Sequence, residues 1–299
     1  MNPNPNAVFI GFQKAGSTLL RGYFSLHPQI QWTKKAIFFS LEDFEKQKQD
    51  YFTLLESRRA DCYIDMHEAL AVGYLRKHIK DWGEKDVDLG YAATHPFSQT
   101  PVTLIPSRIH QLLPQTKIII TLRNQIDWLR SNYIHVQVRM PANKRRFHFF
   151  LQTIEGERLL AAGYYNHILE AYFDIFGREK VFVLPMEELA SDLEKALQKL
   201  CTFLDIDYHP YPKSKQTVNT GHSLLRARLV EVASRFGLDA RRLRRLSPLI
   251  SVVDKRASSF GRPIISQREL EWLNSKYAAS NKITGEMLGV DLSQYGYTR

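Results

Sequence analysis

Long apolar runs are missing from this sequence. No stretch approaches the roughly 20 consecutive apolar residues that a membrane-spanning helix needs, so no stable membrane insertion is expected. Residues 1–6 have neither the basic start nor the apolar core of a secretory signal. We therefore expect a soluble, cytoplasmic protein in which residues 1–6 are flexible.

Cysteine is almost absent. The 299 residues include only two cysteines, Cys62 and Cys201, and each lies in an apolar segment. Both are predicted to be buried thiols rather than the halves of a disulfide. No cluster of cysteine and histidine has the spacing of metal ligands, so no metal site is expected. The sequence also has no internal repeat and no low-complexity linker.

Acidic residues are outnumbered by basic ones, 31 to 41, which gives a net charge of +10. This balance suggests an anionic partner, such as nucleic acid, anionic lipid or a polyanionic cosubstrate, although a solvated basic face explains it equally well. No aromatic and basic RNA-binding motif is evident, so nucleic acid is not expected. The arginine density peaks at 241–245, within a C-terminal region, 223–299, that is predicted to be a mostly helical extension or cover.

Short apolar runs alternate with longer amphipathic segments, which is the pattern of an α/β fold with a central parallel sheet flanked by helices. One domain is expected to span 1–299. Buried strands are predicted at 7–10, 62–65, 117–122 and 181–184. Helices are predicted after the first strand to about Phe24, after the third strand around Trp128, from Leu159 to Phe176 with a stop at Gly177, and across Leu197–Leu204 behind a Ser191–Glu194 capping box.

The first candidate motif follows the first strand. Gly11 and Gly16 have the spacing of a phosphate-binding loop, and a helix follows them. The lysine that normally follows the second glycine is displaced to Lys14, inside the loop. There its amine can neutralise charge on a bridging oxygen as a leaving group departs, while Ser17 and Thr18 donate hydrogen bonds to a phosphate.

The second candidate motif follows the most apolar strand. Arg123 comes directly after that strand, where ligands of open α/β sheets bind, and Ser131 lies eight residues further on a neighbouring helix face. Arginine binds phosphate through a bidentate fork, and a hydroxyl adds a further donor. The pair is therefore a candidate phosphate site.

Both motifs, in this order and separation, resemble the family of sulfotransferases that depend on 3′-phosphoadenosine 5′-phosphosulfate (PAPS). The resemblance covers roughly residues 7 to 230 and implies a fold like that of P-loop nucleoside triphosphatases. It also implies metal-independent, in-line transfer of a sulfuryl group from PAPS to a small molecule, lipid or sugar, with adenosine 3′,5′-bisphosphate (PAP) as the product. The donor site that it implies consists of Gln13, Lys14, Ala15, Gly16, Ser17, Thr18, Arg123, Ser131, Asn219 and Gly221.

The general base is where this sequence departs from the family. Golgi-type members carry a glutamate before a Phe-Phe pair, but the corresponding residue here is Lys35. Cytosolic members use a histidine in a Lys-Thr-His run, which His95 resembles although Ala93 replaces the lysine. His67 is the rival, because it follows a predicted strand, and the remaining candidates are its neighbours Asp65 and Glu68.

Two other functions stay open. A nucleotide kinase would use the same kind of loop, although the displaced Lys14 and the lack of a clear magnesium-binding aspartate after a strand speak against it. A nucleotide-binding module that has lost its catalytic activity would explain why Lys35 stands where Golgi-type members of the family carry a glutamate.

Overall fold

The computed structural model describes residues 4–41, 43–55, 59–68, 70–72, 102–137, 147–212 and 265–298. At its centre is a five-stranded sheet in the order β2-β3-β1-β4-β5, in which every neighbouring pair is parallel. The strands are β1 (Ala7–Gly11), β2 (Ile30–Thr33), β3 (Cys62–Met66), β4 (Lys117–Leu122) and β5 (Val181–Pro185). The α/β class and the four predicted strands are confirmed, whereas β2 was not predicted.

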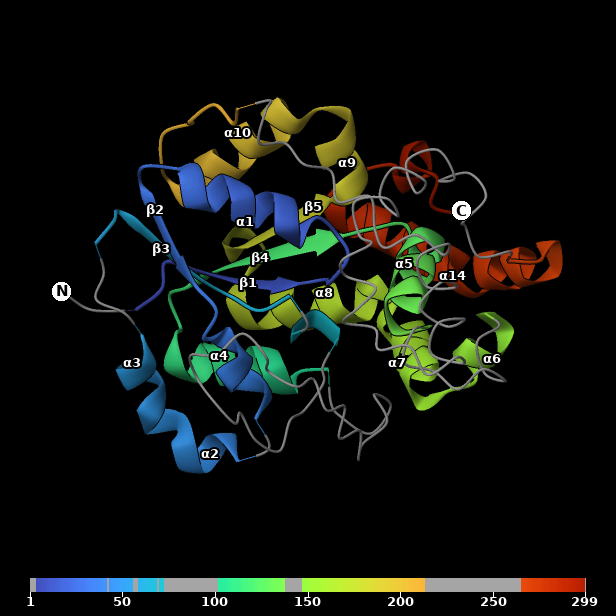
Figure 1. Cartoon of the computed structure of the whole chain (residues 1–299), viewed down its shortest axis with the longest axis horizontal. Coiled ribbons are helices and arrows are strands. Elements are labelled where there is room, and N and C mark those ends of the chain that lie inside the picture. The colour runs from blue at the N-terminus through green and yellow to red at the C-terminus, as the bar shows by residue number, and fades with distance from the viewer. Residues whose placement is uncertain are drawn as a thin grey trace, which may run out of the picture.

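Helices cover both faces of the sheet (Figure 1). The longer ones are α1 (Ser17–Leu26), α4 (Leu104–Leu112), α5 (Gln125–Gln137), α7 (Ile154–Ala162), α8 (Tyr165–Phe176), α9 (Met186–Ser191), α10 (Leu193–Leu204) and α14 (Gln267–Leu288). Shorter turns are α2 (Phe44–Gln47), α3 (Tyr51–Leu54), α6 (Phe147–Leu151), η1 (Ala36–Ser40), η2 (Lys48–Asp50), η3 (Leu70–Val72), η6 (Arg178–Lys180) and η9 (Leu292–Tyr295). Helices α1, α9 and α10 lie over one face and α4 and α8 over the other, while α5, α6, α7 and α14 gather beyond the carboxyl ends of the strands.

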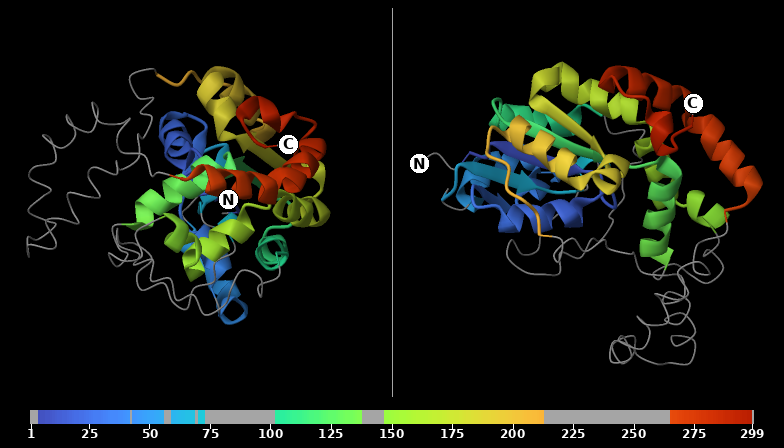
Figure 2. Two further views of the ribbon diagram at one scale, coloured as in Figure 1. Left: turned by 90° about the vertical axis from the view of Figure 1, so that its right-hand side faces the viewer. Right: turned by 90° about the horizontal axis from the view of Figure 1, so that it is seen from above.

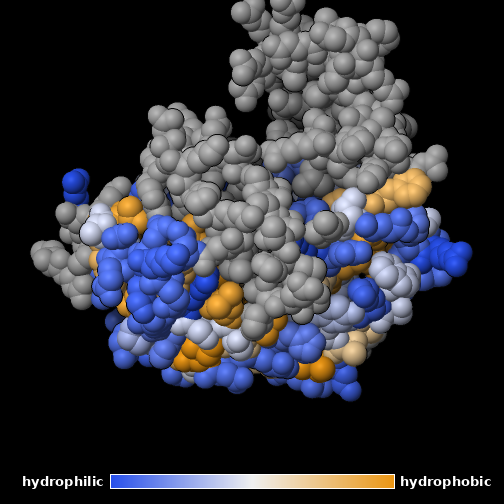
Figure 3. Space-filling model, turned by 90° about the horizontal axis from the view of Figure 1, so that it is seen from below, coloured by the Kyte–Doolittle hydropathy of each residue, from blue (hydrophilic) through white to orange (hydrophobic). Residues whose placement is uncertain are grey.

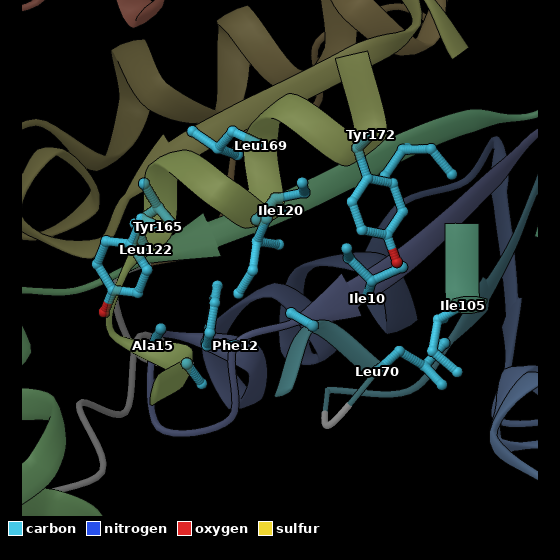
Figure 4. Close-up of a cluster of buried hydrophobic side chains, with 14 of the residues drawn as sticks. Ile10, Phe12, Ala15, Leu70, Ile105, Ile120, Leu122, Tyr165, Leu169 and Tyr172 are labelled. Carbon is cyan, nitrogen blue, oxygen red and sulfur yellow. The ribbon is translucent and has the colours of Figure 1, made fainter. Parts of the chain in front are cut away.

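The strands are apolar along their whole length because both faces of the sheet are covered. In β1, Ala7 and Phe9 pack with α1 and α10, whereas Val8 and Ile10 point to the opposite core. Figure 4 shows this second core, in which side chains of the sheet meet those of α8. Each large apolar side chain buried in this way contributes roughly 1.5–3 kcal/mol.

The continuous helix predicted over 159–176 is wrong, because the chain forms α7 and α8 with a break at Gly163. A Cβ at Gly163 would lie 2.7 Å from the ring of Tyr277 on α14. The Gly163 carbonyl accepts a hydrogen bond from the side chain of Gln125 on α5. Two segments distant in sequence therefore hold the break, although the predicted stop at Gly177 is confirmed.

The predicted capping box at Ser191 is also wrong. Ser191 is the last residue of α9, and the N-cap of α10 is Asp192, whose carboxylate accepts a hydrogen bond from the backbone N–H of Lys195. Aspartate is as good an N-cap as serine, so the helix starts one residue later than predicted.

Cys62 and Cys201 are both buried thiols rather than the halves of a disulfide, as predicted. Helix α14 packs against α8 and α5, and the two views of Figure 2 show it at the carboxyl end of the sheet. In the described part of the chain, no helix has both the length and the apolar character required to cross a bilayer. On the face seen in Figure 3, apolar side chains form separate patches among polar ones.

The arginine cluster at 241–245 lies outside the described residues. The expectations of one domain over 1–299, and of a helical cover across the whole of 223–299, stay predictions.

Candidate active site

The two sequence motifs meet at one edge of the sheet. In the strand order β2-β3-β1-β4-β5, the chain goes from β1 toward the β2 end of the sheet, whereas from β4 it goes in the opposite direction, to β5. The adjacent carboxyl ends of β1 and β4 therefore form a topological switch point, which is where open α/β sheets bind ligands. The loop after β1 and Arg123 after β4 both lie there.

The loop after β1 has a backbone conformation that requires glycine at two positions, Gly11 and Gly16. Gly11 has a φ of 107°, and a Cβ at this position would lie 2.1 Å from the carbonyl oxygen of Glu68. Gly16 has a φ of 93° and directly precedes α1. Lys14 also has a positive φ, 64°, which a non-glycine residue adopts only at some cost in energy. The loop thus curls tightly against the turn after β3.

The start of α1 suits an anion. Gly16 occupies the N-cap position; among the residues that the structure describes, no side chain caps this helix, and its first turn contains no acidic residue. The unpaired backbone N–H groups and the helix dipole give this end a partial positive charge. Ser17 is buried at this end, and Thr18 beside it is exposed and accepts a hydrogen bond from Arg21.

Arg123 is bound to the loop. Its guanidinium donates a hydrogen bond of 3.0 Å to the carbonyl oxygen of Lys14, and its own carbonyl accepts one of 2.7 Å from the hydroxyl of Tyr165. The indole N–H of Trp128 on α5 donates to the carbonyl of Gln13 at 2.8 Å. The loop and the residues after β4 are therefore one connected unit.

The amine of Lys14 lies in a largely desolvated place. Burial lowers the pKa of this amine and the charge of Arg123 lowers it further, whereas the carboxylate of Glu68 acts in the opposite direction. The net shift is downward, because burial disfavours the charged form. Lys14 therefore has two charged neighbours of opposite sign.

Asp65 is enclosed at the end of β3. It has no exposed surface, and its carboxylate accepts hydrogen bonds from the Tyr51 hydroxyl and the Lys35 backbone N–H, both at 2.7 Å. Burial raises the pKa of Asp65 to about 6, and the hydrogen bonds limit the rise. Both carboxylate oxygens are engaged, so Asp65 holds the turn into η1 and is available neither to an acceptor nor to a metal ion.

Glu68 is partly exposed and lies in a basic environment. Its carboxylate is 4.0 Å from the amine of Lys34. Burial alone would raise the pKa of Glu68, but the electrostatic interactions with His67, Lys34 and Arg21 and a backbone hydrogen bond outweigh it, and the pKa is lowered. The backbone N–H of His67 donates to the carbonyl of Phe9, which ties this turn to β1. The Glu68 side chain is therefore ionised at neutral pH.

A comparison with sequence models of protein families identifies the family of this chain. Residues 5–210 match the sequence model of the family described as "Sulfotransferase family". This chain belongs to the sulfotransferase family.

Curated sulfotransferases show a distant similarity to it. The chain is 23% identical to the human bifunctional heparan sulfate N-deacetylase/N-sulfotransferase 2 over 214 residues, which cover 68% of this chain and 22% of that protein. It is 22% identical to the mouse carbohydrate sulfotransferase 15 over 248 residues, which cover 68% and 44%. The chain thus spans less than half the length of these relatives.

One solved structure has the same fold. It is a sulfotransferase from Alicyclobacillus acidocaldarius, with a TM-score of 0.62 and 20% sequence identity over 98% of this chain and 99% of that one. The P-loop-like sulfotransferase fold expected from the sequence is therefore confirmed.

The structure describes most of the predicted donor residues. Those from Gln13 to Thr18 lie with Arg123 at the carboxyl ends of β1 and β4, and Ser131 is half-buried on α5, the helix that follows Arg123. His95, Asn219 and Gly221 lie outside the described residues.

Sequence reasoning missed two residues that fix the Arg123 segment. Tyr165 holds the carbonyl of Arg123, and Glu187 accepts a hydrogen bond from the backbone N–H of Asn124 at 2.8 Å. Glu187 had a weak signal, since it is an acidic residue close behind the apolar strand at 181–184.

Proposed function

We propose that this chain is an enzyme that transfers a sulfuryl group from PAPS to a hydroxyl or amine of an acceptor. The observation that carries the proposal is the Arg123 guanidinium bonded to a loop that holds Lys14 next to the N-terminus of α1. Two cationic side chains and the backbone N–H groups at the start of α1 can then bind the anionic groups of PAPS, which are its 5′-phosphosulfate and its 3′-phosphate. The residues assigned to the donor are Gln13, Lys14, Ala15, Gly16, Ser17, Thr18, Arg123 and Ser131, together with Asn219 and Gly221 outside the described part.

Lys14 acts on the leaving group. As the acceptor oxygen or nitrogen bonds to sulfur, the bond between sulfur and the bridging phosphate oxygen breaks, and PAP leaves with both electrons of that bond. The Lys14 ammonium donates a hydrogen bond to this oxygen and offsets its developing charge. Partial burial strengthens this interaction because the surroundings are less polar than water. Positioning and charge stabilisation supply most of the catalysis, as in loose phosphoryl transfer.

Glu68 removes the acceptor proton. Of the two carboxylate candidates, Asp65 is enclosed and hydrogen-bonded at both oxygens, whereas Glu68 is partly exposed and interacts electrostatically with Lys14. Glu68 is ionised at neutral pH, which is the form that a base requires, and the proton passes from acceptor to carboxylate during transfer. His67, next to it, and His95 are the rival bases.

The acceptor belongs to the small molecules, lipids or carbohydrates, and a carbohydrate is favoured. The printed names of the relatives, which include a carbohydrate sulfotransferase and a heparan sulfate N-sulfotransferase, support this choice. One of these names specifies N-sulfation and the other specifies no acceptor atom, so we assign no preference between a hydroxyl and an amine.

The donor assignment predicts tight binding of PAP without a metal. Calorimetric titration in EDTA should give a dissociation constant in the micromolar range or below, which corresponds to about −8 kcal/mol or better. ATP should bind at least about tenfold more weakly and without a requirement for Mg²⁺. Binding of ATP that depends on Mg²⁺, together with no binding of PAP, would favour a nucleotide kinase instead.

Arg123→Ala should weaken PAP binding by about 1.5–3 kcal/mol, or roughly 10- to 150-fold, because a charged hydrogen-bond donor to a phosphate is lost. Arg178→Ala is the matched control. Arg178 also donates to a backbone carbonyl, that of Val181, but this residue begins β5 and so lies at the end of the sheet away from the site. Titration of both variants with PAP measures the difference. An unchanged affinity in Arg123→Ala would remove this residue from the donor site.

A further inference from the structure

A partly buried carboxylate joins the carboxyl end of the sheet to the end of the chain. Glu187 is the second residue of α9, directly behind β5. One of its oxygens accepts a hydrogen bond from the backbone N–H of Asn124 at 2.8 Å, and the other accepts one from the Tyr297 hydroxyl at 3.2 Å. Asn124 directly follows Arg123, so one side chain connects the C-terminal residues to the segment that carries the guanidinium.

The C-terminal residues are themselves fixed. The side-chain amide of Asn124 donates to the carbonyl of Gly296 at 2.6 Å, next to Tyr297, whose side chain is 2% exposed. The carbonyl of Thr298 accepts a hydrogen bond of 3.1 Å from Asn281 on α14. The segment 296–298 is therefore held between α14 and the end of β4.

These contacts hold the backbone of Arg123 from both sides. Its carbonyl accepts from the Tyr165 hydroxyl, and the next residue is bound through its backbone to Glu187 and through its side chain to Gly296. The Asn124 side-chain oxygen also accepts from the backbone N–H of Ile126 at 3.0 Å, at the start of α5. Ordering a backbone segment costs conformational entropy, so a segment that is already fixed before the donor arrives does not add this cost to the binding of an anion by Arg123.

The charges around Glu187 are consistent with this linkage. Burial raises the pKa of Glu187, whereas the hydrogen bonds from Asn124 and Tyr297 and the nearby positive charge of Arg123 act against the rise. Burial and the charge of Glu187 raise the pKa of Tyr297, and the charge of Arg123 acts against this rise as well. The positive charge of Arg123 therefore favours the ionised form of Glu187 that accepts both hydrogen bonds.

We propose that Glu187 and Tyr297 are positioning residues, through which the C-terminal segment 296–298 holds Arg123 in the orientation that binds the donor's phosphate. This inference rests on the proposed function and adds to it a part of the chain far from both sequence motifs. The C-terminal segment then contributes to donor affinity without contacting the donor. It should change the KM for PAPS and leave kcat at saturating PAPS nearly unchanged.

Two conservative variants test the proposal. Tyr297→Phe removes one hydroxyl, and Glu187→Gln keeps the shape of the side chain but removes its charge. Each should raise the dissociation constant of PAP and the KM for PAPS about tenfold and change kcat at saturating PAPS less than about twofold. Tyr277→Phe is the matched control, because this buried tyrosine on α14 also donates one hydrogen bond, of 2.9 Å, to the carbonyl of Leu160.

The outcomes separate the two proposals. If the wild-type chain does not bind PAP, the proposed function fails, and the positioning role fails with it. If the wild type binds PAP and both variants bind it equally well, only the positioning role is overturned. An equal loss of affinity in Tyr277→Phe would overturn it too, since the effect would then be a general loosening of the C-terminal region. Thermal unfolding of all variants shows that the comparison is made between folded proteins.

Discussion

Lys14→Ala should lower kcat by at least about 100-fold, because removing one preorganised donor to a developing negative charge has an effect of this size. The residue lies in the loop after β1, and its carbonyl, rather than its amine, bonds to Arg123. The loop backbone can therefore keep its conformation when the side chain is shortened. PAP binding should weaken much less than turnover, and the melting temperature should stay close to that of the wild type.

The pH dependence gives a second measure of the same role. The reaction needs the ammonium form of Lys14, and the pKa of this amine is lowered. Activity should therefore decline, as pH rises, at a lower pH than that at which an exposed lysine loses its proton.

Lys199→Ala is the matched control for Lys14→Ala, because this lysine lies on the surface of α10 and pairs with Glu188. Near-normal turnover in Lys14→Ala would refute the assigned role.

Glu68→Gln should lower kcat by about 10²–10⁴-fold, the range that a general base contributes. The amide keeps the size of the side chain but cannot take up the acceptor proton. Because the pKa of Glu68 is lowered, the acid limb of the wild-type kcat profile should lie below the pH at which an ordinary glutamate protonates. PAP affinity should change little, since the base acts on the acceptor. Initial rates at saturating PAPS, measured across pH, give all of these quantities.

Three variants discriminate between the candidate bases. His67→Ala should retain turnover within about tenfold, because it leaves the Glu68 carboxylate in place and changes only the charge beside it. Glu194→Gln, on α10, is the control for loss of a surface carboxylate. If His95→Ala is inactive while Glu68→Gln keeps its activity, the base is His95 and the assignment made here is wrong.

The core of the fold is readable in the sequence because its signals are local. A strand covered on both faces needs an unbroken apolar run, and the runs at 7–10, 62–65, 117–122 and 181–184 provide it. The edge strand Ile30–Thr33 was missed because its sequence, IQWT, is mixed and its middle residues are only half-buried. The break at Gly163 was missed for a different reason. An isolated glycine does not by itself end a helix, and the residues that stabilise the break, Tyr277 and Gln125, are distant in sequence.

The donor half of the candidate site was also predictable. A glycine loop between a strand and a helix, and an arginine directly behind another apolar strand, are each defined by a few neighbouring residues. Their joint position follows from the parallel sheet, whose carboxyl ends face one way. The base was not predictable, because Asp65 and Glu68 are equivalent by sequence and differ only in burial and hydrogen bonding.

The sequence by itself determined the α/β class, the phosphate-type loop with Lys14 inside it, and the placement of Arg123 at a strand end. Only the tertiary structure decided that Asp65 is enclosed, that Glu68 is partly exposed and lies 4.0 Å from the amine of Lys34, and that the last residues of the chain bind the segment after β4. The physical reason is range. Apolar periodicity and glycine turns act between neighbouring residues, whereas the burial of a carboxylate and its hydrogen-bond partners depend on segments that meet only once the sheet has formed.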